Sequence, residues 1–137
     1  TIRNDGTFPG KDIGEVLVHG LENTMYIDKV DGGTHKKQSG PVTIEQEVDR
    51  VYLDTSSECV IDDPGWQRRI HIAKSGSRST VVWNPWIAKA DKMGDLGING
   101  YRKMLCVEST NAADDVVTIA PNKEHHLWVR YSLEKKI

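Results

Sequence analysis

Residues 101–108 read Tyr-Arg-Lys-Met-Leu-Cys-Val-Glu, and this stretch indicates the fold more clearly than any other. As a β-strand it places Met104, Cys106 and Glu108 on one side, and Leu105 and Val107 on the other. Both sides are apolar over most of the strand, which is typical of a strand that is covered on both faces. We therefore expect residues 103–107 to form an interior strand of a β-sheet.

Short strand signals of the same kind occur along the whole chain. They are rich in β-branched residues, are bounded by Gly, Asp or Pro, and lie at residues 13–18, 42–48, 51–53, 58–61, 69–73, 79–83, 103–107, 115–119 and 126–133. Strands that recur about every 8–14 residues with turns between them are typical of an all-β sandwich or barrel. We therefore expect an antiparallel β-sandwich that spans residues 1–137 as a single domain.

Turn and helix signals complete this outline. Ser75-Gly76-Ser77 separates two expected strands and predicts a hairpin between them. Only residues 86–96 have helical composition, with Asn84-Pro85 as a cap and first turn. The fold is thus expected to contain at most one short helix.

Composition narrows the class of protein. The 137 residues carry 18 Lys and Arg against 20 Asp and Glu, so the formal net charge is −2. This balance argues against nucleic acid or an anionic membrane as a partner, because both attract a basic surplus. No apolar run approaches the ~20 residues of a membrane span, and no signal peptide is evident, so a cytoplasmic protein is expected. The chain opens with Thr1 rather than Met, which suggests a piece of something longer.

Glu108 is the first candidate for chemistry. It follows the apolar strand on the same side as Met104 and Cys106, where loss of hydration favours proton transfer near neutral pH. Alternatively, Glu108 lies just beyond the sheet and faces water. The spacing alone leaves both interpretations open.

Asp49 and a pair of tryptophans are the other candidates. Asp49 interrupts an apolar stretch and could hold a ligand hydroxyl, or it could form a surface ion pair with Arg50. Trp83 and Trp86 flank a turn at a strand end, where two indoles could stack on a sugar or fill the core. The pattern alone leaves these alternatives open as well.

The remaining residue patterns point to no metal ion or cofactor. Cys59 and Cys106 lack a second cysteine at metal-ligand spacing, and the five histidines show no ligand spacing: His19, His35, His71, His125 and His126. The chain also lacks a nucleophile elbow, a phosphate loop and a dinucleotide fingerprint. No cofactor and no metal are therefore expected.

Several stretches, taken in order, resemble one family. They are Asp12-Ile13 with Val16 and His19-Gly20-Leu21, Tyr26–Val30, Glu47–Leu53, Val81–Trp86, Met93-Gly94-Asp95 and Gly100–Glu108. In this order and spacing they are similar to the carboxy-terminal half of glucose-6-phosphate 1-epimerases, the hexose-6-phosphate mutarotase branch of the aldose 1-epimerase superfamily. The resemblance covers about residues 12–133.

This resemblance implies a partial galactose-mutarotase-like supersandwich and an interconversion of sugar anomers without a cofactor. In the family a glutamate takes the proton of the C1 hydroxyl while a histidine protonates the ring oxygen. The glutamate matches Glu108, the aspartate that holds substrate hydroxyls matches Asp49, and the turn at the pocket rim matches Trp83-Asn84-Pro85. A hexose or hexose 6-phosphate is the implied ligand, and Trp83 and Trp86 are candidates to contact it.

The chain also departs from the family pattern. Family members are about twice as long, and the arginines that hold the sugar phosphate belong to the half that is missing here. The histidine motif should fall near residues 5–8, where Asp5 stands in the histidine's place, so residues 1–11 form a divergent segment before the half-sandwich of 12–133. Catalytic activity could therefore be lost, which leaves a carbohydrate-binding module as the alternative function.

A third alternative is a structural role. A half-sandwich exposes the face and edges that the missing half covers in the family, and open sheet edges pair readily with other chains. We therefore expect a homodimer that forms through the exposed surface.

Overall fold

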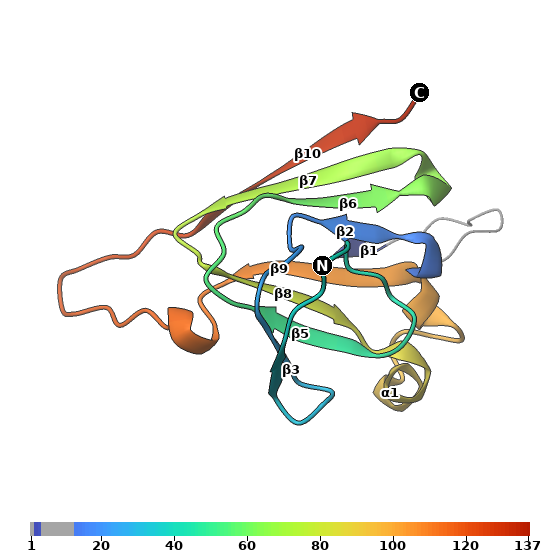
Figure 1. The fold of residues 1–137 in the computed structure, drawn as a ribbon, viewed down its shortest axis with the longest axis horizontal. Helices are drawn as coiled ribbons and strands as arrows, with labels where there is room; N and C mark the ends of the chain where they lie inside the picture. Colours follow the sequence, from blue (N-terminus) through green and yellow to red (C-terminus); the bar gives the residue numbers. More distant parts are fainter. Residues whose placement is uncertain (1, 4–12) are drawn as a thin grey trace.

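Two antiparallel β-sheets pack face to face in the computed structural model, which describes residues 2–3 and 13–137 (Figure 1). The larger sheet has six strands in the order β1-β9-β8-β5-β3-β4, and the smaller has four in the order β10-β7-β6-β2. A single α-helix occurs among the described residues. These features confirm the predicted all-β antiparallel sandwich with at most one short helix.

The larger sheet contains residues 104–108 of the apolar segment 101–108. Its strands, in spatial order, are β1 (Ile2–Arg3), β9 (Met104–Thr110), β8 (Ser79–Asn84), β5 (Val48–Tyr52), β3 (Tyr26–Asp28) and β4 (Thr34–Lys36). β9 is an interior strand of this sheet, and its first four residues are buried. The prediction of an interior strand at 103–107 is confirmed, apart from a shift at its start.

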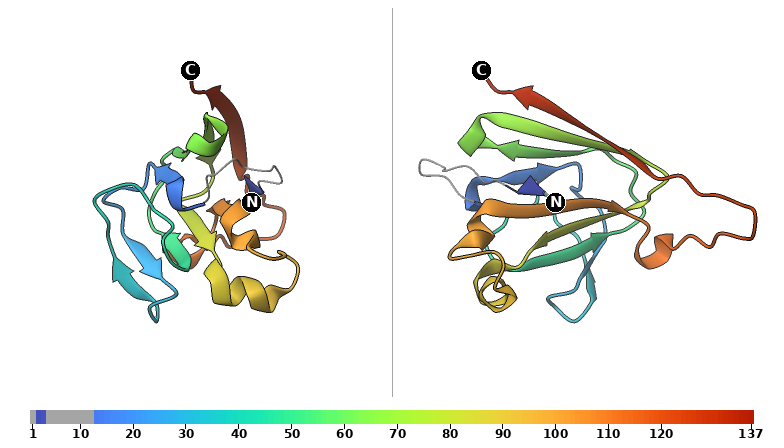
Figure 2. Two further views of the ribbon diagram at one scale, coloured as in Figure 1. Left: turned by 90° about the vertical axis from the view of Figure 1, so that its right-hand side faces the viewer. Right: turned by 180° about the vertical axis from the view of Figure 1, so that it is seen from behind.

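The smaller sheet lies across the core from the larger one (Figure 2). Its strands, in spatial order, are β10 (Trp128–Lys135), β7 (Arg68–Ser75), β6 (Cys59–Asp63) and β2 (Leu17–His19). β10 pairs with β7 along its whole length and forms one edge of the sheet.

Helical segments are short. α1 (Trp86–Met93) follows β8 and ends at Gly94, whose φ of 71° is the left-handed conformation that commonly terminates a helix. The predicted helix at 86–96 is therefore confirmed in position but ends earlier. Four 3₁₀ turns complete the elements: Ile13–Glu15, Pro64–Trp66, Gly100–Lys103 and Ala113–Asp115.

The core fills the space between the two sheets. Strand residues of alternating position supply it from both sides, and its fully or nearly fully buried members include Val18, Leu21, Ile44, Tyr52, Ile61, Ile72, Val82, Leu105 and Val107. Because side chains alternate across a strand, the residues between them point away from this core. That alternation defines the face on which the candidate site lies.

Three predicted strands differ from the structure. In the one predicted at 13–18, Ile13–Glu15 forms a 3₁₀ turn and β2 begins only at Leu17. Within the predicted strand 42–48, Val42 and Ile44 are buried and Thr43 and Glu45 are exposed, but β5 begins only at Val48, and Val42 forms no more than an isolated bridge to Val18. Residues 43–47 are therefore a connection outside both sheets that places Ile44 in the core. Residues 115–119 lie in a long connection that projects from one end of the sandwich, and their apolar side chains are exposed (Figure 1).

The predicted hairpin at Ser75-Gly76-Ser77 is also wrong. β7 belongs to the smaller sheet and β8 to the larger one, so the chain crosses between layers at this turn. The two short strands β3 and β4 lay outside the predicted set because each has only three residues. The divergent segment predicted at 1–11, including Asp5 in the histidine position, falls almost entirely outside the described residues.

Candidate functional site

The larger sheet has one face toward the core and one face away from it. On β8 and β9 the core-facing residues are Val82, Leu105 and Val107, all buried in the core cluster. Their neighbours along the strands therefore project from the opposite face. We call this opposite face the site face, and define it by Val51, Asp49, Val81, Trp83, Cys106 and Glu108.

Glu108 lies on the site face in a row that crosses three strands. It pairs with Val81 on β8, which pairs in turn with Val51 on β5. Glu108 is partly buried, and β9 continues beyond it to Thr110. The carboxylate therefore lies within the sheet rather than beyond its end, which argues against the interpretation that Glu108 simply follows the strand into water.

Asp49 lies in the adjacent row of the same face. It pairs with Trp83 on β8, and Trp83 pairs with Cys106 on β9. Glu108 and Asp49 thus stand on the two strands that flank β8, roughly 12 Å apart at their Cα atoms. Trp83 lies between the two carboxylates, on the same side of the sheet, so a ligand placed over β8 can meet all three side chains.

Arg50 is oriented away from Asp49. Its guanidinium lies 4.6 Å from the centroid of the Tyr26 ring and donates a hydrogen bond of 3.4 Å to the hydroxyl of Tyr52. Because consecutive residues of a strand project to opposite faces, these contacts place Asp49 on the site face and Arg50 on the other. The geometry argues against the alternative of an Asp49–Arg50 surface pair.

A lysine that the sequence analysis did not single out lies near Asp49. Lys89 of α1 pairs with Glu47 at 2.6 Å, and this hydrogen bond, assisted by the charge of Asp49, raises the pKa of Lys89 above its usual value. The only sequence signal for Lys89 was its place in the expected helix. Its position depends on how α1 folds back beside the start of β5.

Trp86 has a different environment from Trp83. Its ring packs edge-on against Tyr101, with 5.0 Å between ring centroids, and it borders the core cluster. This packing favours the core-filling interpretation for Trp86 and separates it from the site face that carries Trp83. Contact of either tryptophan with a sugar stays a prediction.

Asn84 holds the turn between β8 and α1. Its side-chain nitrogen donates to the carbonyl oxygens of Tyr101 and Met104, both at 2.8 Å, and its oxygen accepts from the Trp86 N–H at 2.8 Å. Trp86 has a positive φ of 56°, a strained conformation for a bulky residue. Asn84 therefore links the end of β8 to the start of β9, the two strands that carry Trp83 and Glu108.

The cysteines are packing residues in this structure. Cys59 and Cys106 are both buried and neither is in a disulfide. Burial raises the pKa of the Cys59 thiol to about 11, so it stays protonated at neutral pH. Cys106 lies on the site face beside Trp83 and contributes a small side chain there.

Among the described histidines, only His35 lies on a strand of the larger sheet, whereas His125 lies in the connection before β10 and bonds to Asn111 at 3.1 Å, just beyond the end of β9. His35 on β4 pairs with Ile27 and shares the site face, but four strand spacings separate it from Glu108, about 19 Å. One hexose ring cannot contact both side chains. Within residues 13–137, no group of three or more His, Cys, Asp or Glu side chains could hold a metal ion.

A hollow of about 480 Å³ lies away from the site face, at the start of β8. Its lining includes Asp54, Arg78 and Asp115. Arg78 pairs with Asp54, and the Arg78 backbone N–H donates to Asp115 at 2.7 Å, so these charged groups are engaged with one another. The hollow contains none of the residues that the sequence predicted for the site.

Comparison with known proteins agrees with this architecture. The crystal structure of a "putative mutarotase (YeaD)" from Salmonella typhimurium superposes with a TM-score of 0.67 at 35% identity, over 72% of this chain and 33% of that one. The crystal structure of HI1317 gives the same TM-score at 26% identity, over 90% of this chain and 42% of that one. The fold therefore matches part of the mutarotase fold, as the resemblance implied.

Sequence comparison leads to the family itself. Residues 4–132 match the family model described as aldose 1-epimerase. A "putative glucose-6-phosphate 1-epimerase" from Cenchrus ciliaris is 39% identical over 114 residues, and one from Escherichia coli is 35% identical over 117 residues. The chain belongs to the aldose 1-epimerase family. It spans 34% and 39% of the lengths of these two relatives, and 82% and 85% of its own length is matched.

Proposed function

We propose that this chain carries part of an aldose 1-epimerase site, in which Glu108 is the general base and Asp49 holds sugar hydroxyls. The observation that carries the proposal is that Glu108, Asp49 and Trp83 share one face of the larger sheet in adjacent rows. Two carboxylates beside an aromatic ring suit a sugar, whose hydroxyls donate hydrogen bonds and whose C–H face packs on an indole.

The reaction proposed for the site is a proton transfer at each end of one bond. Glu108 takes the proton from the C1 hydroxyl, the bond between C1 and the ring oxygen breaks, and the ring oxygen receives a proton from an acid. Rotation of the aldehyde and closure of the ring give the other anomer, and the two protons return to their donors. Each step is acid–base chemistry and requires no cofactor.

No described residue is assigned as the acid that protonates the ring oxygen. The family's histidine position corresponds to Asp5, which lies outside the described residues, and His35 is too distant from Glu108 to serve the same ring. Loss of one acid or base lowers the rate by about 10²–10⁴-fold. We therefore expect the chain on its own to bind sugar and to retain little of the rate of a complete epimerase.

The proposed ligand is a hexose or hexose 6-phosphate. Support comes from the relatives, whose names specify glucose 6-phosphate. The arginines that the family uses for phosphate have no counterparts among the predicted site residues. A free hexose and its 6-phosphate are accordingly expected to bind with similar affinity.

Exchange spectroscopy tests the proposal directly. Saturation transfer between the anomers of glucose 6-phosphate measures their interconversion with and without the protein. We expect weak acceleration by the chain and its complete loss in Glu108→Gln, which keeps the size and hydrogen bonding of the side chain but cannot take a proton. Acceleration that survives in Glu108→Gln would show that another group is the base.

Binding without turnover is the second candidate function, and the position of Trp83 between Asp49 and Cys106 favours it. Titration of the tryptophan fluorescence with glucose and glucose 6-phosphate detects such binding. We expect Asp49→Asn to weaken binding by about tenfold, since a charged hydrogen bond contributes on the order of 1.5–3 kcal/mol. Equal affinity in Asp49→Asn and the unmodified chain would exclude Asp49 as the hydroxyl anchor.

Two further predictions concern the cell and the assembly. No helix in the described part of the chain is long and apolar enough to cross a membrane. A cytoplasmic location is still a prediction, which imaging of a fluorescent fusion would test. A homodimer is also proposed, and the edge of β10, with which no described strand pairs, favours it.

A further inference from the structure

β10 offers an edge that no described strand occupies. All eight of its residues pair with β7 on one side, and β10 ends the order of the smaller sheet on the other. Figure 2 shows β10 at the rim of the molecule, with the C-terminus beyond it. Backbone groups along an edge of this kind are available to pair with another strand.

Exposed apolar side chains of β10 lie on the same face of the smaller sheet as its buried core residues. Leu133 pairs with Ile70, and Tyr131 pairs with Ile72, so these four side chains lie on one face. Ile70 and Ile72 are buried, whereas Leu133 is 72% exposed and Tyr131 is 58% exposed. The core face therefore runs past the region that the larger sheet covers.

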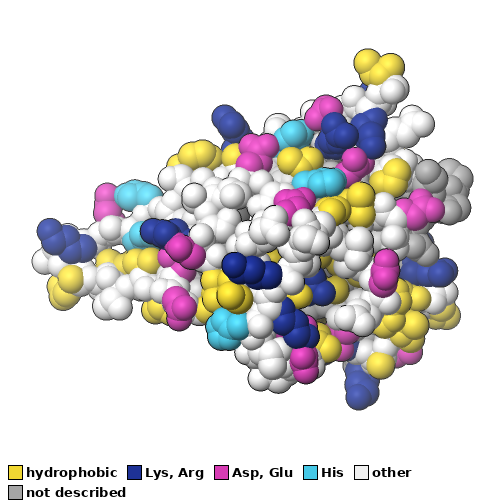
Figure 3. All heavy atoms as spheres, viewed as in Figure 1, with side chains coloured by type: hydrophobic (Ala, Val, Ile, Leu, Met, Phe, Trp, Pro, Cys, Tyr) yellow, Lys and Arg dark blue, Asp and Glu magenta, His cyan; other side chains and the backbone are white. Residues whose placement is uncertain are grey.

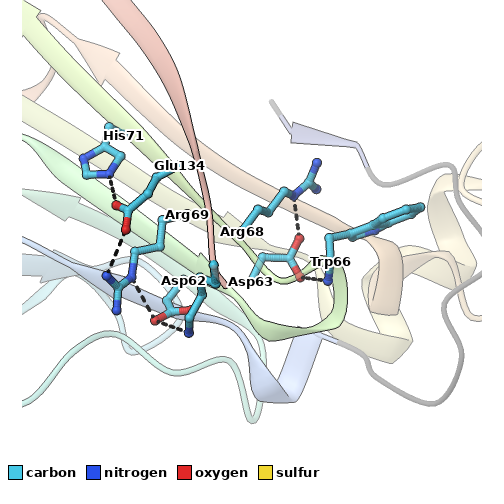
Figure 4. Close-up of polar contacts among 8 residues, drawn as sticks. Asp62, Asp63, Trp66, Arg68, Arg69, His71 and Glu134 are labelled. Carbon is cyan, nitrogen blue, oxygen red and sulfur yellow. Dashed lines mark hydrogen bonds and ion pairs between the residues drawn. The ribbon is translucent and has the colours of Figure 1, made fainter.

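Ion pairs hold β10 in place from the opposite face of the sheet. Glu134 accepts from Arg69 at 3.4 Å and lies 2.9 Å from His71, as Figure 4 shows. Just beyond β10, Lys136 donates to Asp62 at 2.8 Å. Figure 3 shows basic, acidic and histidine side chains gathered over the smaller sheet. The ion pairs fix the edge in an extended form before any partner binds, which lowers the entropic cost of pairing.

The sequence of β10 is complementary to itself in one antiparallel register. If two copies pair about a two-fold axis at Ser132, Tyr131 of each copy lies opposite Leu133 of the other. Arg130 then lies opposite Glu134, twice, and no like charges face one another. Arg130 is exposed and has no ion pair within the described part of the chain, so its charge is available for this contact.

Neighbouring registers lack this match. A shift that centres the axis on Tyr131 places Arg130 opposite Ser132, which offers no charge. A shift that centres it on Leu133 places Arg130 opposite Lys136, a like-charge contact that destabilises pairing. Each of these axis positions shifts the pairing by two residues. A shift by a single residue is excluded because it would place the side chains on the wrong faces of the sheet. Charge therefore selects the register centred on Ser132.

We propose that two copies of this chain pair through their β10 edges about a two-fold axis at Ser132. The pairing joins both smaller sheets into one continuous sheet and brings Tyr131 and Leu133 of the two copies together. A strand edge is small beside a standard interface of ~1,600 Å², so the dimer is weak. The proposal does not depend on sugar binding, because β10 lies in the smaller sheet and the site face belongs to the larger one.

Sedimentation velocity from about 1 μM to about 1 mM tests the assembly. We expect the sedimentation coefficient to rise from monomer to dimer, and Arg130→Glu to weaken the dimer by about tenfold, because it replaces two cross-strand attractions by repulsions. Circular dichroism should show an unchanged fold, since Arg130 is exposed. A monomer at every concentration, or a dimer unaffected by Arg130→Glu, overturns the proposal.

Cross-linking tests the register. Directly opposite residues have Cβ atoms about 4.5–5.5 Å apart, close to the ~3.5–4.5 Å of a disulfide, so Ser132→Cys should form a covalent dimer on mild oxidation. Arg130→Cys is the matched control, since its two copies lie about 13 Å apart in this register. The native cysteines are buried and supply no background. Efficient cross-linking of Tyr131→Cys or Arg130→Cys, with little at Ser132→Cys, overturns the register.

Discussion

Replacement of Asn84 by alanine should strongly lower the free energy of unfolding, because Asn84 holds the turn at the rim of the candidate site. The side chain is fully buried, and its three hydrogen bonds of 2.8 Å serve two carbonyl oxygens and one backbone N–H. Asn84→Ala leaves these groups without their partner in a region that water does not reach. An unsatisfied buried group costs about 1–3 kcal/mol, so three such groups predict a loss of roughly 3–9 kcal/mol in the free energy of unfolding.

That loss is a large fraction of the ~5–15 kcal/mol that stabilises a typical domain. Urea denaturation followed by tryptophan fluorescence and by circular dichroism measures it, and coincident transitions verify two-state unfolding. Gln46→Ala is the matched control, because it removes an exposed amide and should change stability by no more than about 0.5 kcal/mol. A loss below about 1 kcal/mol in Asn84→Ala would refute the role assigned to these hydrogen bonds.

Two further predictions concern the smaller sheet. Gly20→Ala should lower the free energy of unfolding by more than about 1 kcal/mol, because φ of Gly20 is +97° and the added Cβ meets the Glu58 carbonyl oxygen. Urea denaturation measures this loss. Gly40→Ala is the control and should be nearly neutral, because nothing lies within contact distance of its added Cβ. Hydrogen bonds to Glu58 and then Glu134 raise the pKa of His71 above 6.5, so its stabilising contribution is complete below about pH 6.5 and is lost as the pH rises through the folded-state pKa. The free energy of unfolding of His71→Gln should not show this decrease with rising pH. An NMR titration that finds the pKa of the His71 imidazole at or below 6.5 would contradict the stabilising role of its contacts with Glu58 and Glu134.

Much of the fold could be predicted because burial in a β-sheet leaves a period of two in the sequence. The residues of β9 alternate around a covered strand, and Leu105 and Val107 are in the core as that pattern requires. The same signal misled at residues 42–47, where Val42 and Ile44 are buried although the segment forms no strand. Alternation reports which side chains are covered, and it does not report whether the backbone has a neighbouring strand to pair with.

The turn at Gly76 shows a second limit of local reasoning. A Ser-Gly-Ser turn between two strand signals predicts a hairpin, but β7 and β8 belong to different sheets. Turn residues specify the backbone conformation at the turn itself. Whether the next strand pairs with the last or crosses to the other layer depends on which strands are available as partners, and those come from distant parts of the chain.

For the candidate site, the sequence by itself determined the residue types and, through resemblance, the family to which the chain belongs. Only the tertiary structure decided that Asp49, Trp83 and Glu108 share one face, that Trp86 packs on Tyr101, and that Lys89 lies near Asp49. The physical reason is that strand register and helix placement arise from contacts between residues far apart in the chain. Local preferences select each element, whereas long-range pairing decides which side chains meet.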